Sequence, residues 1–292
     1  MTTLQTGDMA SLQTIGVIGA GTMGTGIAQV CALAGLSVSM LDVDEQRVAH
    51  GRDAVAGGLE RLVKKAKLSA AAGDAALGRL HGTTDYGALR ACDFIIEAAT
   101  ENEALKLQIL REVDAVAPPG AIVATNTSSI SIAKLAASTG RAPRFVGMHF
   151  FNPVPVMALV EVVHAPRTEP STIEAAVALA KRLGKTPVVV KDSPGFVVNR
   201  LLCPMLNEAV LAYGEGIASA QDIDEAMKLG CNHPIGPLAL CDLIGLDVLL
   251  AVMELLHRDF NDPKYRPAPL LKEMVADGKL GRKAGHGIYT YS

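Results

Sequence analysis

The sequence has no long uninterrupted apolar run and no large excess of charge of one sign. Glycines and polar residues interrupt the apolar residues of 14–41 too often for a membrane span. The formal net charge is -3, and lysine and arginine form no stripe of the kind that nucleic-acid binders present. These absences predict a protein whose partner is neither a membrane nor a nucleic acid.

Cysteine is scarce as well, and its placement indicates neither a disulfide framework nor a metal site. The five cysteines are scattered, odd in number and mostly set among apolar neighbours, which is typical of buried free thiols in a reducing compartment. No cysteine or histidine spacing matches that of metal ligands. Residues 1–13 also do not have the basic end and the apolar run of a secretory signal. We therefore expect a cytoplasmic protein without a metal ion.

The sequence does contain enough apolar residues for a sizeable core. Of its 292 residues, 49% are hydrophobic and 20% are charged, which is typical of a well-packed globular protein. This length exceeds the usual size of one compact core, so two domains are expected.

The first 192 residues alternate between short apolar runs and helical stretches. Strands are predicted at 14–19, 36–42, 94–98, 121–125, 145–150, 159–163 and 186–190. Helices are predicted at 22–34, from Asp44 to about Lys67, and at 69–78, 103–116, 131–137 and 171–183. The alternation predicts an α/β domain with a mostly parallel sheet that helices cover.

The pattern changes after the run Asp192-Ser193-Pro194-Gly195, which we interpret as a domain boundary. Only helical signals follow, at 196–213, 219–229, 242–258 and 269–276. The sequence therefore predicts a second, all-helical domain at 193–292.

The turn between the first predicted strand and the first predicted helix has the pattern G-x-G-x-x-G. Gly19 permits the tight turn, Gly21 lets the backbone approach a pyrophosphate, and Gly24 lets helix and strand pack closely. The helix start, with Thr22 and Met23, then offers free N–H groups to a negative charge. A purely structural turn is the alternative, but strand, turn, helix and strand follow one another in the order of a dinucleotide site. We therefore predict a Rossmann-type dinucleotide-binding domain at 1–192.

An acidic residue follows these glycines at the spacing of a ribose contact. Asp42 ends the second predicted strand, about twenty residues on, and can accept hydrogen bonds from an adenosine ribose hydroxyl. Its charge would repel the extra phosphate of NADP, so the sequence favours NAD as the cofactor. NADP remains the weaker alternative because Arg47 is close by.

Two polar residues stand in apolar strands on either side of a proline-rich turn. His149 lies at the end of one predicted strand, and Glu161 lies inside the run LVEVV of the next. Taken singly, each has an ordinary structural explanation. The turn at 152–155 can bring the two strands side by side, and a carboxylate beside an imidazole fixes its tautomer and stabilises its cation. The pair suits a general base that takes a proton from an alcohol.

Several longer runs carry a resemblance to a known family. These runs are NTSS at 126–129, HFFNPVPVM at 149–157, DSPGFVVNR at 192–200 and GPLALCDLIGLD at 236–247. With them, the chain resembles the L-3-hydroxyacyl-CoA dehydrogenase family, in particular its bacterial members that act on 3-hydroxybutyryl-CoA. The resemblance covers residues 14–291, in the order and spacing of the family.

The resemblance implies roles for the residues at matching positions. It implies that His149 is the catalytic histidine and Glu161 its partner, and that Ser128 and Asn199 hydrogen-bond the reacting oxygen and the thioester end of the substrate. The other positions that match cofactor or substrate contacts are Glu101 and Lys106 near the nicotinamide and its ribose, Asn126 and Ser128 at the cofactor, and Asn152 at the substrate.

The implied function is an NAD-dependent oxidoreductase. It would interconvert a short-chain L-3-hydroxyacyl-CoA, such as 3-hydroxybutyryl-CoA, and a 3-oxoacyl-CoA, such as acetoacetyl-CoA. Fatty acid metabolism is the expected setting, but butyrate or polyester metabolism and aromatic degradation need the same reaction. Two alternatives stay open: a dehydrogenase of the same fold that acts on a non-CoA 3-hydroxy acid such as a sugar acid, and a non-catalytic NAD-binding structural protein. His149 and Glu161, together with the NTSS run, argue against the 3-hydroxyacid dehydrogenases that use a catalytic lysine.

Two further features allow more than one interpretation. A basic cluster on the long helix after the second strand either meets the phosphates of CoA or forms a solvated face; it consists of Arg61, Lys64, Lys65 and Lys67. The helical domain has long apolar faces at 201–212 and 243–256. They suggest a subunit interface, and family members commonly dimerise through this domain, so we expect a homodimer; burial within the monomer is the rival explanation.

Overall fold

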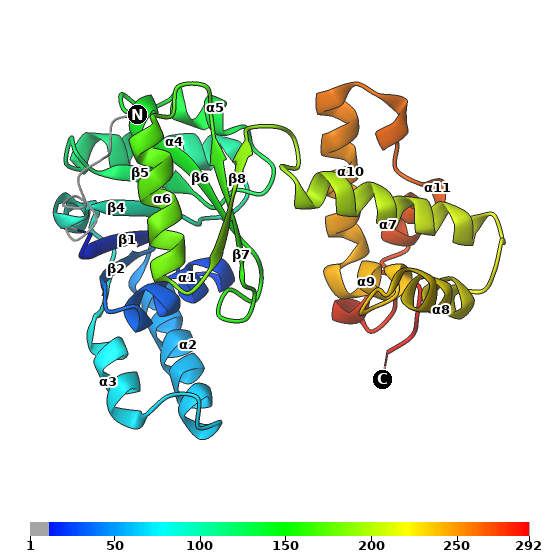
Figure 1. The fold of residues 1–292 in the computed structure, drawn as a ribbon, viewed down its shortest axis with the longest axis horizontal. Coiled ribbons are helices and arrows are strands. Elements are labelled where there is room, and N and C mark those ends of the chain that lie inside the picture. Colours follow the sequence, from blue (N-terminus) through cyan, green and yellow to red (C-terminus); the bar gives the residue numbers. More distant parts are fainter. Residues whose placement is uncertain (1–11, 292) are drawn as a thin grey trace. The chain divides into compact units, whose positions relative to one another are not determined.

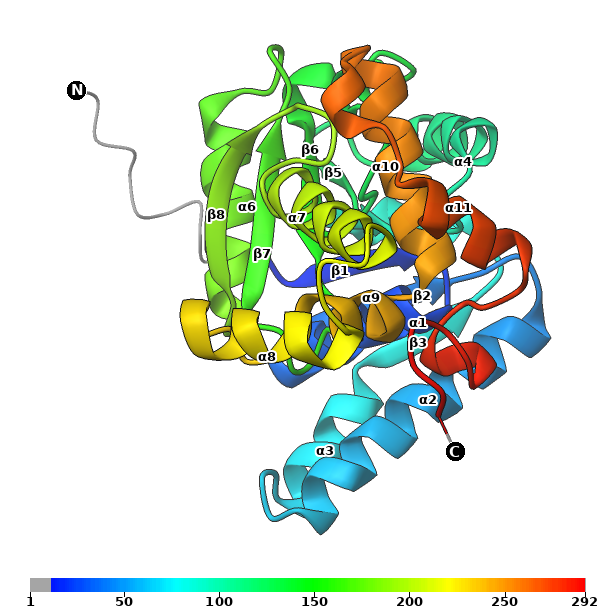
Figure 2. The same cartoon turned by 90° about the vertical axis from the view of Figure 1, so that its right-hand side faces the viewer.

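The structure is a computed structural model that describes residues 12–291 (Figures 1 and 2). The chain divides into two compact units between Asp192 and Ser193. The first unit is α/β and the second is helical. Most of the stretch that we compared with a secretory signal lies outside the described residues. Substrate binding and dimerisation by the second unit stay predictions.

The first unit is built on one eight-stranded sheet with the strand order β3-β2-β1-β4-β5-β6-β7-β8. Its strands are β1 (Thr14–Ile18), β2 (Ser37–Leu41), β3 (Leu80–Thr83), β4 (Phe94–Glu97), β5 (Ile122–Thr125), β6 (Phe145–Phe150), β7 (Leu159–His164) and β8 (Thr186–Lys191). All neighbouring strands are parallel except β6 and β7, which are antiparallel. The predicted Rossmann-type, mostly parallel sheet is therefore confirmed.

Several helices of the first unit begin at a residue whose side chain caps the first turn. They are α1 (Thr22–Leu33), α2 (Glu45–Lys64), α3 (Ala70–Gly78), α4 (Glu103–Val116), α5 (Ile132–Ala136) and α6 (Pro170–Arg182), with short 3-10 helices η2 (Tyr86–Ala91) and η3 (Ala142–Arg144). Asp44 accepts a hydrogen bond from the backbone N–H of Arg47 at the start of α2, as predicted. The helix ends earlier than predicted, because Ala66 adopts a left-handed conformation with a φ of 53°.

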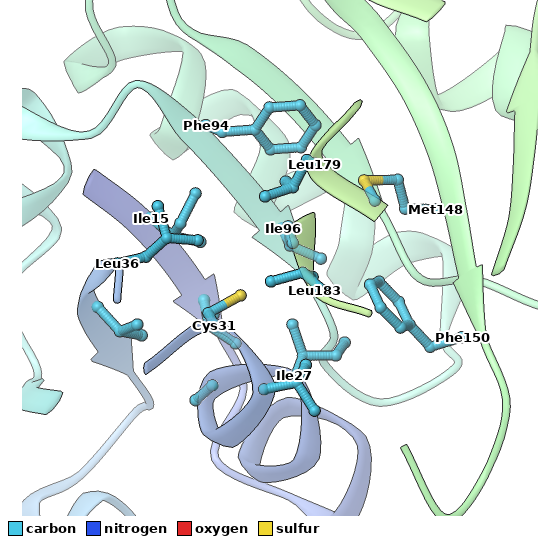
Figure 3. Close-up of a cluster of buried hydrophobic side chains, with 14 of the residues drawn as sticks. Ile15, Ile27, Cys31, Leu36, Phe94, Ile96, Met148, Phe150, Leu179 and Leu183 are labelled. Atoms are coloured by element: carbon cyan, nitrogen blue, oxygen red, sulfur yellow. The ribbon is translucent and has the colours of Figure 1, made fainter. Parts of the chain in front are cut away.

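Side chains of a strand alternate between the two faces of the sheet, and this separates the core from the site. On one face, Ile96, Met148 and Val162 join a core with residues of α1 and α6 (Figure 3). The opposite face is covered by α4 and α5 (Figure 1); a Cβ atom on Gly147 would meet the side chain of Ile132 at 2.8 Å. His149, which alternates with Met148, therefore lies on the face away from the large core.

The strand β3 was not predicted from the sequence. Its run LHGT has no β-branched or aromatic residue in its first three positions, and only Leu80 is buried. Because β3 is an edge strand that pairs with β2 alone, few of its side chains need to be apolar.

The second unit consists of helices around a core of its own. They are α7 (Val198–Gly214), α8 (Ala220–Cys231), α9 (Pro237–Ile244), α10 (Leu246–Phe260) and α11 (Pro269–Ala276), with the 3-10 helices η4 (Pro263–Tyr265) and η5 (Arg282–Ala284). The prediction of one helix at 242–258 was wrong. Gly245 has a φ of 106°, which ends α9 and starts α10 in a new direction.

The cysteines and the helices test two expectations from the sequence, namely buried free thiols and the absence of a membrane span. Cys31, Cys92, Cys203 and Cys241 are buried free thiols, but Cys231 is exposed at the end of α8, so burial was wrong for that residue. Burial raises the pKa of Cys31 to about 12, in spite of the nearby Arg182. Among residues 12–291, no helix is long and apolar enough to cross a membrane.

Candidate active site

The glycine turn leaves open space for a ligand backbone where β1 meets α1. Gly19 has a φ of 104°, and a Cβ atom on it would lie 2.6 Å from the carbonyl oxygen of Ala98. A Cβ atom on Gly24 would collide with the carbonyl oxygen of Gly19. A Cβ atom on Gly21, which caps the helix without a side-chain hydrogen bond, would meet nothing within 4 Å. The first N–H groups of α1 therefore face room for a pyrophosphate, so this turn fits a dinucleotide.

Asp42 lies beside this turn and organises it. Its Oδ2 atom accepts a hydrogen bond from the backbone N–H of Ala20 at 2.6 Å, and its Oδ1 atom accepts one from the N–H of Val43 at 2.7 Å. The carboxylate is half-buried, and each oxygen has a second lone pair for a further donor. The geometry is compatible with the predicted ribose contact, which stays a prediction.

His149 and Glu161 face each other across the one antiparallel strand pair of the sheet. Their backbones are in register, and Nδ1 of His149 lies 2.8 Å from Oε2 of Glu161. The side chain of His149 is 8% exposed and that of Glu161 is 1% exposed. A carboxylate can only accept, so Nδ1 carries the hydrogen and donates to Glu161. The expected neighbourhood of carboxylate and imidazole is present; the catalytic roles stay predictions.

A buried ion pair lies at the end of β4 on the same face of the sheet. The Nζ atom of Lys106 is 2.7 Å from Oε1 of Glu97, and the two side chains are 1% and 0% exposed. The other oxygen of Glu97 accepts a hydrogen bond from Thr125 at 2.6 Å. Lys106 is also 3.5 Å from a carboxylate oxygen of Glu101. The side chain of Lys106, predicted at the cofactor, is therefore held by two carboxylates.

Glu101 holds the backbone and hydroxyl groups of the NTSS run. Its Oε1 atom accepts hydrogen bonds from Thr127 Oγ1, from the backbone N–H groups of Ser128 and Ser129, and from Ser129 Oγ. Burial acts to raise the pKa of Glu101, but Lys106 and these hydrogen bonds outweigh it and keep the pKa below its usual value. The charged carboxylate thus fixes the segment that carries Ser128.

Two of the predicted asparagines, Asn126 and Asn152, lie at the ends of the strands next to His149. Oδ1 of Asn126 accepts a hydrogen bond from the backbone N–H of Phe150 at 2.9 Å, which ties the end of β5 to the residue after His149. Asn152 is exposed at the start of the β6–β7 connection. The structure therefore brings Ser128, Asn126 and Asn152 to the ends of β5 and β6.

The remaining predicted residues lie elsewhere. Asn199 is in the first turn of α7, in the second unit, and its role stays a prediction. The basic cluster Arg61, Lys64, Lys65 and Lys67 is exposed at the end of α2, and Lys64 pairs with Glu60 at 2.8 Å. Among the described residues, no group of three potential metal ligands is present.

Sequence reasoning missed two residues of this region, Glu97 and Lys185. Glu97 carried the same signal as Glu161, a carboxylate inside an apolar run, and could have been found in that way. Lys185 stands alone before β8, and nothing in its local sequence distinguishes it from a surface lysine. Its Nζ atom nevertheless contacts two carbonyl oxygens of the β6–β7 connection.

Comparisons with known proteins find similar sequences for both units of the chain. The family model for the NAD binding domain of 3-hydroxyacyl-CoA dehydrogenase matches residues 14–193, and the model for the C-terminal domain matches residues 195–291. A probable 3-hydroxybutyryl-CoA dehydrogenase of Deinococcus radiodurans is 48% identical over 276 residues, which cover 94% of this chain and 99% of the relative.

Solved structures are similar over the same length. The crystal structure of (S)-3-hydroxybutyryl-CoA dehydrogenase from Ralstonia eutropha has a TM-score of 0.95 and 60% identity, covering 97% of this chain and 100% of that chain. An NAD-dependent 5-formyl-3-hydroxy-2-methylpyridine 4-carboxylic acid 5-dehydrogenase has a TM-score of 0.76 and 34% identity, covering 96% of this chain and 91% of that chain.

Proposed function

Because this chain belongs to the 3-hydroxyacyl-CoA dehydrogenase family and is an NAD-dependent enzyme, we propose that it interconverts short-chain L-3-hydroxyacyl-CoA and 3-oxoacyl-CoA. 3-Hydroxybutyryl-CoA is the proposed substrate, since relatives named 3-hydroxybutyryl-CoA dehydrogenase are similar over nearly the whole chain, and acetoacetyl-CoA is the product of its oxidation at the third carbon. The observation that carries the chemistry is the buried pair of His149 and Glu161, 2.8 Å apart.

His149 acts as the general acid and base. With Nδ1 donating to Glu161, Nε2 is the nitrogen that takes the proton of the 3-hydroxyl group in the oxidation direction. The carboxylate of Glu161 stabilises the imidazolium that forms. When bound, NAD supplies the hydride acceptor. In the reduction direction the protonated His149 returns its proton to the oxygen of the substrate.

The neighbouring polar residues orient the substrate and the cofactor. Ser128 and Asn199 hydrogen-bond the reacting oxygen and the thioester end, which holds the proton and the hydride in one geometry. The turn at 19–24 and Asp42 hold the pyrophosphate and the adenosine ribose. A carboxylate at position 42 disfavours a phosphate on that ribose, so NAD is preferred to NADP.

The test is a spectrophotometric assay of NADH consumption with acetoacetyl-CoA. We expect rapid, substrate-dependent loss of NADH, much slower loss of NADPH, and declining activity along a series of 3-oxoacyl-CoA substrates from four to sixteen carbons. Loss of NADH with a free 3-oxo acid but not with its CoA thioester would contradict the proposed substrate. Binding of NADH without turnover of either compound would contradict the proposal of an enzyme of this reaction.

A non-CoA substrate is the second candidate. One solved structure with a similar fold is named as a dehydrogenase of a pyridine carboxylic acid, and its name mentions no CoA. A similar fold therefore occurs in a dehydrogenase named for a different class of substrate. The assay above includes this alternative as one of its outcomes.

For the protein as a whole, we propose a cytoplasmic homodimer that serves fatty acid metabolism. Bulky apolar side chains exposed on the second unit support self-association, among them Leu201 and Leu243. The scattered cysteines without disulfide bonds support a reducing compartment. The proposed reaction, oxidation at the third carbon of an acyl-CoA, supports the metabolic role.

A further inference from the structure

The connection between β6 and β7 joins the two members of the proposed acid/base pair. It spans residues 151–158, between His149 and Glu161 in the chain. Its first residue, Phe151, packs its ring against the imidazole of His149, with centroids 4.5 Å apart. Its second residue is Asn152, which we propose to contact the substrate. The position of this connection therefore determines what surrounds the imidazole.

Most of the connection is exposed, so only a few contacts hold it. Apart from half-buried Phe151, only Val154 of residues 151–158 is shielded from solvent, at 2% exposure. Val154 packs on α1 at Gly26, where a Cβ atom would meet the Cβ of Val154 at 2.8 Å. Within the connection, the N–H groups of Val156 and Met157 donate to the carbonyl oxygen of Pro153, at 2.9 and 3.0 Å.

Lys185 supplies the anchor on the other side. Its Nζ atom donates to the carbonyl oxygen of Val154 and, at 2.9 Å, to that of Met157, which come from both ends of the turn. Its own backbone is fixed at the end of α6, where its N–H donates to the carbonyl oxygen of Ala180 at 2.9 Å. One side chain thus links α6 and β8 to the connection that follows His149.

The surroundings of Lys185 indicate that its ammonium group has a task beyond packing. Lys185 is 9% exposed, and no carboxylate of residues 12–291 lies within 4 Å of its Nζ atom. Burial lowers the pKa of its ammonium group below the usual value. A charge buried without a counter-charge costs stability, and an apolar side chain of the same length would avoid that cost. An apolar side chain could not, however, donate to two carbonyl oxygens at once.

We propose that Lys185 is a positioning residue: by binding the carbonyl oxygens of Val154 and Met157, it fixes the 151–158 connection and thereby sets Phe151 and Asn152 against His149 and the substrate. This inference rests on the proposed function for its effect on the reaction. The geometric part, that Lys185 holds the connection in place, does not depend on the substrate.

The test compares Lys185→Met with Lys185→Arg and with Lys191→Met, which removes an exposed lysine at the far end of β8, the strand that follows Lys185. For Lys185→Met we expect kcat/KM with acetoacetyl-CoA to fall by about tenfold to hundredfold, the size of effect that misplaced groups produce. NADH binding should stay unchanged, because Val154 still packs on α1. Lys185→Arg should recover part of the loss, and Lys191→Met should behave as the wild type.

A stability measurement separates positioning from a merely structural role. If Lys185 only supported the fold, Lys185→Met would lower Tm along with activity. We expect Tm to remain equal or to rise, because a buried charge is removed, while the activity falls. A double variant with Asn152→Ala should lose little more than Asn152→Ala alone, since both changes act through the same connection.

Hydrogen exchange tests the anchor without any substrate. In Lys185→Met, the amides of Val156 and Met157 should exchange faster than in the wild type and in Lys191→Met. Unchanged exchange would overturn the anchor, and faster exchange with unchanged kcat/KM would overturn its effect on the reaction. A wild-type protein without activity on acetoacetyl-CoA would instead contradict the proposed function, and the exchange measurement would still judge Lys185.

Discussion

Among single residues, His149 carries the proposed chemistry, because a buried carboxylate lies next to its imidazole. Glu161 is almost fully buried and has its carboxylate against Nδ1 of His149. A buried carboxylate next to the ring stabilises the imidazolium and fixes the tautomer that leaves Nε2 as the base. The same pair in solvent would be screened and would rotate freely.

This predicts the effect of His149→Gln. The amide keeps a polar side chain of similar size in the strand but cannot take up a proton, so turnover should fall by about a hundredfold to ten-thousandfold. The dissociation constant of NADH, measured by fluorescence titration, should stay within about twofold because the glycine turn and Asp42 are unaltered. Turnover close to that of the wild type would remove His149 from the mechanism.

His164→Gln is the matched control, because His164 lies on β7, next to the strand of His149, and is half-buried. It should leave turnover unchanged. Glu161→Gln should lower turnover less than His149→Gln, and the double variant should be no worse than His149→Gln alone, since the glutamate acts only through the histidine. Additive losses in the double variant would mean that Glu161 has a separate task.

At the scale of elements, the end of α4 depends on a single arginine. Arg141 donates to the carbonyl oxygens of Asp114 and Ala117 at the end of the helix, and its Nε atom lies 2.6 Å from Oδ1 of Asp114. Its side chain is 10% exposed. The last carbonyl groups of a helix have no partners within it, so Arg141 satisfies groups that burial would otherwise leave unpaired.

Arg141→Met should therefore lower the free energy of unfolding by about 2 kcal/mol, because a half-buried carboxylate loses its cation and several carbonyl groups lose their donor. Arg144→Met, at an exposed arginine with one long hydrogen bond to Gly120, should cost about 0.5 kcal/mol or less. Urea unfolding followed by circular dichroism measures both changes. Equal losses in the two variants would contradict the capping role.

The ion pair of Arg141 and Asp114 makes the stability of the protein depend on pH. Burial acts to raise the pKa of Asp114, but the hydrogen bonds from Arg141 and from the N–H of Gly140 outweigh it and lower the pKa below its usual value. A carboxyl group with a lowered pKa in the folded state adds stability above its unfolded pKa, and this stability is lost as the pH falls through the folded pKa. The difference between the wild type and Arg141→Met should therefore shrink in acid.

Most elements could be predicted because their signals are local. Short apolar runs indicated seven of the strands, and capping residues such as Asp44 located helix starts. The pairing of His149 with Glu161 followed from one antiparallel turn. What failed depended on context: β3 is an edge strand that needs few apolar residues, and the break at Gly245 depends on one positive φ that glycine permits but does not require.

The contacts that the sequence did not predict, in the site and elsewhere, join residues far apart in the chain. The Nζ atom of Lys185 reaches a carbonyl oxygen 31 residues away, and Arg141 reaches Asp114 27 residues away. Backbone carbonyl groups carry no sequence signal, so no pattern announces a side chain that binds them. For Lys106, the sequence did not predict the ion pairs with Glu97 and Glu101, and its place near the cofactor stays a prediction.

For the molecule as a whole, exposed apolar side chains of the second unit support the proposed homodimer. These residues are Val197, Leu201, Ile217, Leu229, Leu243 and Val248. Leu201 is 69% exposed and Leu243 is 52% exposed, and they belong to the two apolar faces that the sequence identified at 201–212 and 243–256. A twofold-symmetric dimer would bury Leu201 and Leu243 on both copies with one set of contacts.

We therefore expect Leu201→Glu and Leu243→Glu to convert a dimer into a monomer in sedimentation velocity experiments. Stable interfaces bury about 1,200–2,000 Å², and two charges introduced symmetrically into such an area lose their hydration and repel each other. Leu229→Glu is the matched control: the residue is 78% exposed at the end of α8, outside both faces, and the variant should remain dimeric. A wild-type protein that sediments as a monomer at micromolar concentration would contradict the dimer, whereas dissociation by Leu229→Glu alone would move the interface to α8.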